Sequence, residues 1–166
     1  MIRNYESFSF LKKHKFDKRI ILDHNLYVFN RHAKQFWRDL GVEEFTVPAE
    51  LSADEMETMG MNGCALTVYG RFPVMVTAQC IRKTVSECTG RKGILYLTDR
   101  KDKKYPVRNY CDFCYNVIYS MSVLYLGGQT DRIRRLSPDG LILRFSVEDR
   151  EETIKLLRLA TDAFTA

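Results

Sequence analysis

Two strand-then-helix units follow each other directly along the chain, and this alternation constrains the fold more than any other feature of the sequence. The apolar run RIILDHN precedes NRHAKQFWRDLG, where apolar residues recur at helical spacing, at Ala33, Phe36, Trp37 and Leu40. In FTVPAELSADEMETMG, a strand over residues 45–47 leads to a capping box at Ser52 and Glu55, and Gly60 ends the helix. Strands that alternate with helices favour a parallel sheet, either open or closed into a barrel.

Two further strands are predicted over residues 64–70 and 140–146, and the second leads into a C-terminal helix with Ser146 as its N-cap. The pattern between these strands predicts a hairpin, in which GILYLTD and KKYPVR flank a charged tip. We therefore predict an α/β fold with a parallel sheet in a single domain, residues 1–166. A basic β-hairpin insertion carrying cysteines is expected at about 71–139, and long insertions of this kind are where function usually lies.

The chain contains five cysteines but few signs of secretion or membrane insertion. No window approaches the roughly 18 consecutive apolar residues of a membrane helix, and the first 15 residues lack the apolar run of a signal peptide. We therefore expect a cytoplasmic protein without a membrane partner. In a reducing compartment an odd number of cysteines argues against a disulfide framework, so metal ligation or redox chemistry is the competing interpretation.

Positive charge is concentrated in one segment. Residues 82–108 carry nine Lys or Arg against three Asp or Glu, a local balance of +6 within a total of +5. The run DRKDKK is typical of a solvated hairpin tip, but a basic segment among cysteines is also a candidate surface for RNA or another polyanion.

Polar residues stand at the ends of the predicted strands, where a barrel would place its active-site mouth. We predict catalytic roles, in substrate binding or proton transfer, for Asp23, Asn25, Glu50 and Arg71. The alternative for each is capping and ion pairing between neighbouring strands. The sequence contains no HExxH, GxSxG, GxGxxG or P-loop motif, so these classes of hydrolase and nucleotide-binding site receive no support.

Several stretches together resemble peptidase family U32, the collagenase-like peptidases. They are ILDHNLYVFN, FTVPAEL, TVYGRFPVMVTAQC, LYLTDRKDKKYPV and GLILRFSVED, and the likeness covers about residues 3–164. The family's full protein is a TIM-type barrel roughly twice as long, so the resemblance implies that this chain is the C-terminal half of that domain, a partial TIM-like (β/α) barrel. Without the first strands such a fragment is expected to be inactive alone and to self-associate through an exposed sheet edge as a homo-oligomer.

The resemblance implies an iron-sulfur cluster held by four cysteines, and oxygen-independent hydroxylation of an RNA base or a similar substrate by the complete protein. Here the matching cysteines are Cys80, Cys88, Cys111 and Cys114. Four thiolates suit either a 4Fe-4S cluster or structural zinc, and spacing alone does not choose between them. The alternative is that they are buried as small hydrophobic residues, which we predict for Cys64. A U32-type peptidase and a zinc-stabilised interaction module remain the alternative functions.

Overall fold

The described part of the structure, a computed structural model, comprises residues 1–85 and 87–165, and its contacts divide into two units. Unit 1 contains Met1–Val68 and Gly128–Ile142, and unit 2 contains Tyr69–Gly127 and the C-terminal segment from Leu143. The prediction of one domain over residues 1–166 stays a prediction. Residues 128–139, which lie inside the predicted insertion at about 71–139, belong to unit 1.

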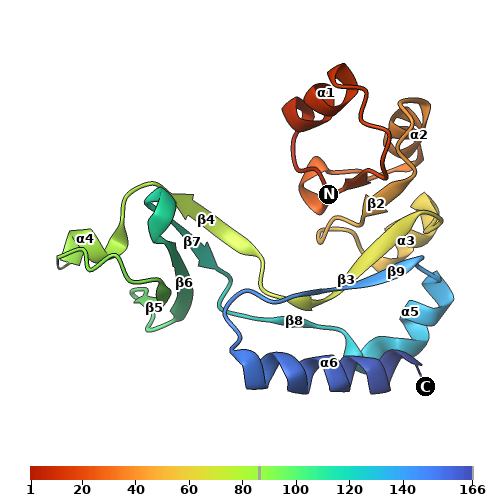
Figure 1. Cartoon of the computed structure of the whole chain (residues 1–166). Helices are drawn as coiled ribbons and strands as arrows, with labels where there is room; N and C mark the ends of the chain where they lie inside the picture. Colours follow the sequence, from red (N-terminus) through yellow and green to blue (C-terminus); the bar gives the residue numbers. More distant parts are fainter. Residues whose placement is uncertain (86, 166) are drawn as a thin grey trace. The chain divides into compact units, whose positions relative to one another are not determined.

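A parallel sheet forms the centre of unit 1 (Figure 1). Strands β1 (Ile21–Leu22), β2 (Glu44–Thr46) and the start of β3 (Cys64–Gly70) pair in parallel and in that order. Strand β9 (Gly140–Arg144) also pairs with β3. The α/β class with a parallel sheet is thus confirmed, and the described strands form no closed barrel.

The helices of unit 1 begin and end where local chemistry dictates. Helix α2 (Arg31–Asp39) starts at Asn30, whose side chain accepts a hydrogen bond from the Ala33 N–H. Helix α3 (Ala53–Met59) has the predicted capping box between Ser52 and Glu55. The structure therefore confirms the two predicted helices. Helix α1 (Tyr5–Lys13) was not predicted, and helix α5 (Thr130–Leu136) lies within the residues of the predicted insertion.

The core of unit 1 is aromatic and aliphatic. Its most deeply buried side chains, each at most 2% exposed, include Leu22, Trp37, Val42, Phe45 and Cys64. The predicted apolar face of α2 is only partly correct, since Phe36 is 53% exposed. Lys34 is 4% exposed instead, because its Nζ donates to the Gly60 carbonyl at 2.6 Å and lies 5.8 Å from the centre of the Phe45 ring.

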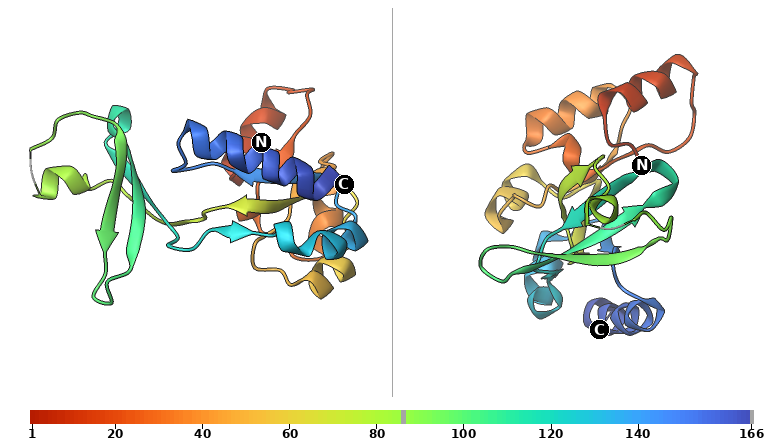
Figure 2. Two further views of the ribbon diagram at one scale, coloured as in Figure 1. Left: turned by 90° about the horizontal axis from the view of Figure 1, so that it is seen from below. Right: turned by 90° about the vertical axis from the view of Figure 1, so that its left-hand side faces the viewer.

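Unit 2 contains a four-stranded antiparallel sheet in the order β4-β7-β6-β5, seen from a second direction in Figure 2. Its strands are β4 (Pro73–Thr77), β5 (Gly93–Thr98), β6 (Lys104–Tyr110) and β7 (Tyr115–Tyr119). The predicted hairpin is therefore β5-β6, and Asp99 fixes its tip by accepting from the Lys101 and Lys103 N–H groups. Strand β4 and helix α4 (Ile81–Val85) precede this hairpin.

The chain leaves this sheet through β8 (Leu124–Tyr125), which pairs with the end of β3, and closes unit 2 with helix α6 (Arg150–Thr165). The predicted N-cap of that helix was wrong. Asp149, not Ser146, accepts from the Glu152 N–H, while the Glu152 carboxylate accepts from the Asp149 N–H. No described helix has the length and apolar character needed to cross a membrane.

Candidate cysteine site

The four predicted ligands all belong to unit 2, and its strand register brings their segments to one end of the antiparallel sheet. Cys80 follows the end of β4, where Thr77 pairs with Asn116 of β7. Cys111 and Cys114 lie in the tight turn between β6 and β7, next to the pair formed by Tyr110 and Tyr115.

The fourth cysteine reaches the same end from the other edge of the sheet. Cys88 lies between α4 and β5, and β5 begins at Gly93, which pairs with Asn109 near the end of β6. Contacts of the turn agree with this placement, because the Cys111 thiol donates to the Arg91 carbonyl at 3.3 Å. Segments separated by more than 30 residues thus converge through strand pairing.

The thiols themselves are not gathered as ligands. Cys80 and Cys111 are half-buried, while Cys88 and Cys114 are exposed. Within residues 1–85 and 87–165, no three or more His, Cys, Asp or Glu side chains form a group that could hold a metal. Cys64 is fully buried, as predicted, and burial raises the pKa of its thiol although nearby Lys34 partly offsets the effect.

A buried amide pair fastens the cysteine-bearing end of the sheet. Asn116 is 1% exposed, and its Nδ2 donates to the Gln79 carbonyl at 2.8 Å and to the Thr77 carbonyl at 3.5 Å. Its Oδ1 accepts from Nδ2 of Asn109, which is also buried. Sequence reasoning missed both residues, although asparagine is disfavoured within strands and could have signalled a special role.

The predicted catalytic residues are divided between the two units. Asp23 is 1% exposed, its Oδ2 pairs with Arg3 Nε at 2.8 Å, and its Oδ1 lies 2.9 Å from His24 Nδ1. Asn25 and Glu50 are exposed at the surface of unit 1. Arg71 belongs to unit 2 and donates to the Ser120 carbonyl at 2.9 Å and to the Met121 carbonyl. Asp23 therefore has an ion-pair partner and Arg71 has backbone partners, and catalysis by the four residues stays a prediction.

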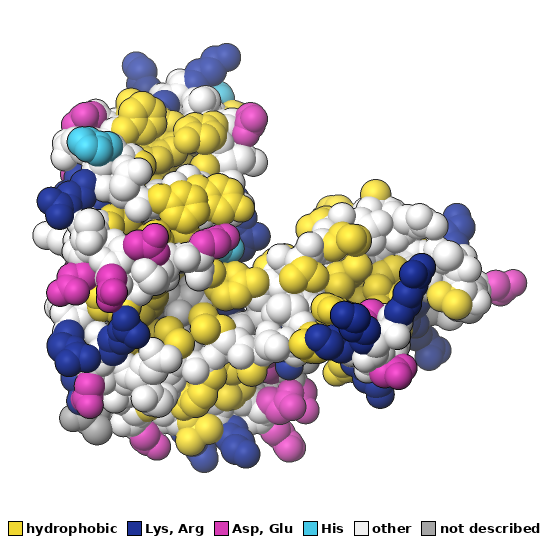
Figure 3. Space-filling model, turned by 180° about the vertical axis from the view of Figure 1, so that it is seen from behind, with side chains coloured by type: hydrophobic (Ala, Val, Ile, Leu, Met, Phe, Trp, Pro, Cys, Tyr) yellow, Lys and Arg dark blue, Asp and Glu magenta, His cyan; other side chains and the backbone are white. Residues whose placement is uncertain are grey.

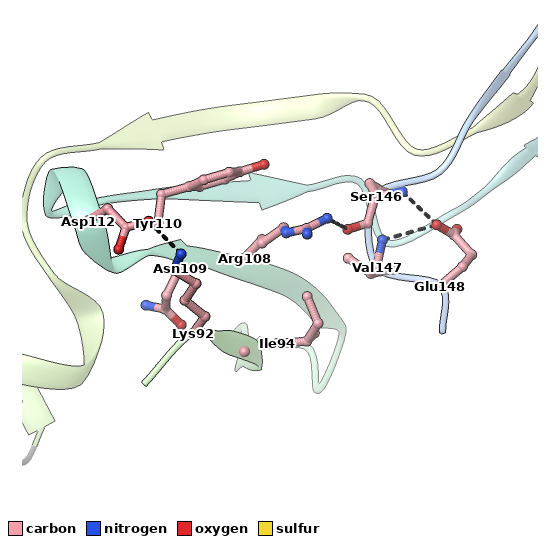
Figure 4. A pocket seen from close by; sticks show the side chains of 10 residues that line it. Lys92, Ile94, Arg108, Asn109, Tyr110, Asp112, Ser146, Val147 and Glu148 are labelled. Carbon is pink, nitrogen blue, oxygen red and sulfur yellow. Dashed lines mark hydrogen bonds and ion pairs between the residues drawn. The ribbon is translucent and has the colours of Figure 1, made fainter. Parts of the chain in front are cut away.

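A cavity of about 400 Å³ lies beside the cysteine turn within unit 2 (Figure 4). Its wall includes Tyr110 and Asp112, which flank Cys111, together with the loop that precedes α6. Tyr110 stacks on Tyr115 with ring centres 4.7 Å apart. Burial, and then a hydrogen bond with Tyr110, raises the pKa of the neighbouring Tyr119.

Comparison with family models, curated proteins and solved structures finds no match for this chain. The resemblance to peptidase family U32 and the partial TIM-like barrel that it implies therefore stay predictions.

Proposed function

We propose that Cys80, Cys88, Cys111 and Cys114 hold a 4Fe-4S cluster. The observation that carries the proposal is the strand register, which brings four cysteine-bearing segments to one end of one sheet. All four residues lie in loops, turns or helix boundaries outside the strands, so their thiols can approach one another without breaking the sheet ladder.

The surroundings favour thiolate ligands. Arg91 and Lys92 lie in the segment between Cys88 and β5, and Lys92 forms an ion pair with Asp112 of the cysteine turn. Nearby cations favour deprotonation of thiols and offset the negative charge of a thiolate-ligated cluster. Such a cluster supplies one-electron chemistry when bound. The chain's own contribution is to hold the thiols and to set the charge and exposure around them.

Metal analysis of cysteine variants tests the proposal. After anaerobic reconstitution the chain should be brown, contain iron and sulfide, and lose most of both when any of the four cysteines is changed to Ala. Cys64→Ala is the matched control, because Cys64 is buried in unit 1 and is not one of the proposed ligands. A colourless protein with one zinc per chain would support the zinc alternative. Absence of both metals, or equal loss in the Cys64 variant, would refute a four-cysteine centre.

We further propose that the complete protein uses this centre in oxygen-independent hydroxylation of an RNA base or a similar substrate, and that residues 82–108 contact the polyanion. Most of the nine cations in this segment lie on exposed positions of α4, its following loop and the β5-β6 hairpin. On the face seen in Figure 3, Lys and Arg side chains lie beside hydrophobic ones on the part built from β4–β7. Exposed rings are available for base stacking, with Tyr96 63% exposed and Phe113 76% exposed.

Salt-dependent RNA binding separates this proposal from nonspecific attraction. Removing two hairpin cations with Lys101→Gln and Lys103→Gln should lower the salt slope of single-stranded RNA binding by about 1 to 2. Lys13→Gln with Lys15→Gln removes the same charge from unit 1 and should leave the slope unchanged. Equal effects of the two pairs, or binding that salt does not weaken, would contradict an RNA-binding role for residues 82–108.

We propose that the chain self-associates as a homo-oligomer through strand β4. This strand lies at the edge of the antiparallel sheet, and Val74, Met75 and Val76 are 57%, 57% and 64% exposed. An uncharged apolar edge strand is a template for pairing with a second chain. Light scattering should show a dimer that Met75→Lys converts to monomer, whereas Val85→Lys on exposed α4 should not. A monomer in the unchanged chain would overturn this assignment.

A further inference from the structure

Two thiols share the tight turn between β6 and β7. Cys111 is the first residue of the 3-10 turn η2 (Cys111–Phe113), and Cys114 follows it with a left-handed backbone, at φ 52°. The Cys114 N–H donates to the Cys111 carbonyl at 3.4 Å, which closes the turn. The first and fourth Cα atoms of a turn lie within about 7 Å of each other, and disulfide-bonded cysteines usually have Cα atoms about 4.4 to 6.8 Å apart. The backbone of this turn therefore has the spacing that a disulfide needs.

Contacts on both sides hold the turn in this form. Tyr110 and Tyr115 are paired in the antiparallel register, so Cys111 and Cys114 are the next position on each side of that pair. The two tyrosine rings stack with their centres 4.7 Å apart and their planes 7° apart. A turn that is already held in place loses little further backbone freedom when its ends are joined.

The two thiols differ in their access to solvent. Cys114 is exposed, whereas Cys111 is half-buried and its thiol donates to the Arg91 carbonyl at 3.3 Å. Lys92, the next residue, forms an ion pair with Asp112 inside the turn (Figure 4). An exposed thiol beside a more protected one is typical of dithiol sites, in which the first sulfur reacts with the oxidant and the second completes the bond.

Separation along the chain favours this pair over the other cysteines. Two residues separate Cys111 from Cys114, whereas seven separate Cys80 from Cys88 and 22 separate Cys88 from Cys111. The entropy lost when a loop is closed increases with the length of the loop. Cys64 is buried in unit 1 and belongs to a different part of the fold.

We propose that Cys111 and Cys114 form a reversible disulfide in the metal-free chain, with a low-molecular-weight disulfide such as oxidised glutathione as the oxidant. The Cys114 sulfur attacks one sulfur of oxidised glutathione, which breaks that S–S bond, forms a mixed disulfide and releases one glutathione thiol. The Cys111 sulfur then attacks the Cys114 sulfur and releases the second glutathione thiol. The two cysteines lose two electrons and two protons, and the two glutathione thiols receive them.

This disulfide goes beyond the proposed cluster, because it requires no metal. It also takes up two of the four proposed ligands, so oxidation of the turn and metal loading exclude each other. A single reversible bond at the surface is not a structural framework, and exposed disulfides are typically the ones that small thiols reduce again.

Mass spectrometry of the whole, metal-free chain tests the site. The reduced chain is treated with increasing amounts of oxidised glutathione, quenched with acid, unfolded and alkylated with N-ethylmaleimide. Trypsin then releases residues 109–132, which contain Cys111 and Cys114 and no other cysteine. This peptide should have lost two hydrogens and carry neither an alkyl group nor glutathione. Modification of Cys88 should need at least about tenfold more oxidised glutathione, because no second thiol in the same turn completes its reaction.

Two variants separate an internal disulfide from general thiol reactivity. Cys111→Ser should leave Cys114 with glutathione attached as a mixed disulfide, because the second step cannot occur. Cys88→Ser is the matched control, since it removes an exposed cysteine outside the turn and should leave the oxidised peptide unchanged. Dispersed amide NMR spectra establish that each variant is folded, and if Cys111→Ser is not, the peptide from the unchanged chain decides.

Three results would overturn the proposal. These are a peptide 109–132 that is still doubly alkylated when Cys88 is already modified, a bond from the turn to Cys80 or Cys88, or as much mixed disulfide in the unchanged chain as in Cys111→Ser. None of these measurements involves a metal. A failed disulfide therefore leaves the cluster proposal standing, and a chain that binds no iron leaves the disulfide standing.

Discussion

Replacing Asn116 by Ala should destabilise unit 2 by about 2 to 4 kcal/mol. The side chain is 1% exposed and makes one strong hydrogen bond to the Gln79 carbonyl, a longer one to the Thr77 carbonyl, and accepts one from Asn109. Each buried group left without its partner costs about 1 to 3 kcal/mol, and the long bond contributes least. The sum is reduced because water can reach some of the freed groups.

Hydrogen-deuterium exchange measured by mass spectrometry can localise this loss, because β4, β6 and β7 yield peptides separate from β1 and β2. Protection should fall in the three strands of unit 2, and urea unfolding should give the free energy. Asn25→Ala is the matched control, since Asn25 is exposed on unit 1 and should change stability by less than about 0.5 kcal/mol. Exchange in β4 and β7 that is unchanged by Asn116→Ala would refute the role of this amide in fastening the sheet end.

The remaining predictions concern the pH dependence of stability, a helix cap and the core. Folding lowers the pKa of Glu148, so its contribution to the free energy of unfolding is present above its ordinary pKa of 4.5 and is lost as the pH falls through the lowered pKa. Urea unfolding between pH 7 and 3 should therefore show a smaller loss of stability at acidic pH for Glu148→Gln than for the unchanged chain. An equal loss in both would contradict this. Asp149→Ala should lower stability by about 1 kcal/mol through loss of the α6 cap, measured by thermal unfolding, whereas Ser146→Ala should show no loss of helix by circular dichroism. Trp37→Ala should lower the free energy of unfolding by about 3 to 5 kcal/mol, measured in urea, whereas Phe36→Ala at an exposed position should lower it by less than about 1 kcal/mol. Similar losses in the two variants would show that the assigned burial of Trp37 is wrong.

The elements that could be predicted from the sequence are those fixed by short-range chemistry. The Ser52 and Glu55 capping box and helix α2 each depend on residues within one short segment, and the β5-β6 hairpin joins two strands that are consecutive in the chain. Local patterns also indicated the α/β class, because two consecutive strand-helix units require a parallel sheet.

Side-chain burial and choice of cap were less predictable. Helical periodicity places Phe36 and Trp37 on adjacent positions of one face, and only packing against Tyr5 and Phe8 of the unpredicted helix α1 selects Trp37 for the core. Likewise Ser146 and Asp149 are both good N-caps by residue type, and the choice depends on where the helix begins. Helix α6 starts at Arg150, and the Asp149 side chain accepts from the Glu152 N–H.

The sequence by itself determined which residues could carry chemistry, above all the cysteines and the basic segment around them. Only the tertiary structure decided that the segments carrying Cys80, Cys88, Cys111 and Cys114 belong to one end of an antiparallel sheet. The physical reason is that pairing between strands far apart in the chain follows from the total burial and hydrogen bonding of the sheet. A short stretch of sequence shows that a strand can form backbone hydrogen bonds, but it does not show with which other strand they form.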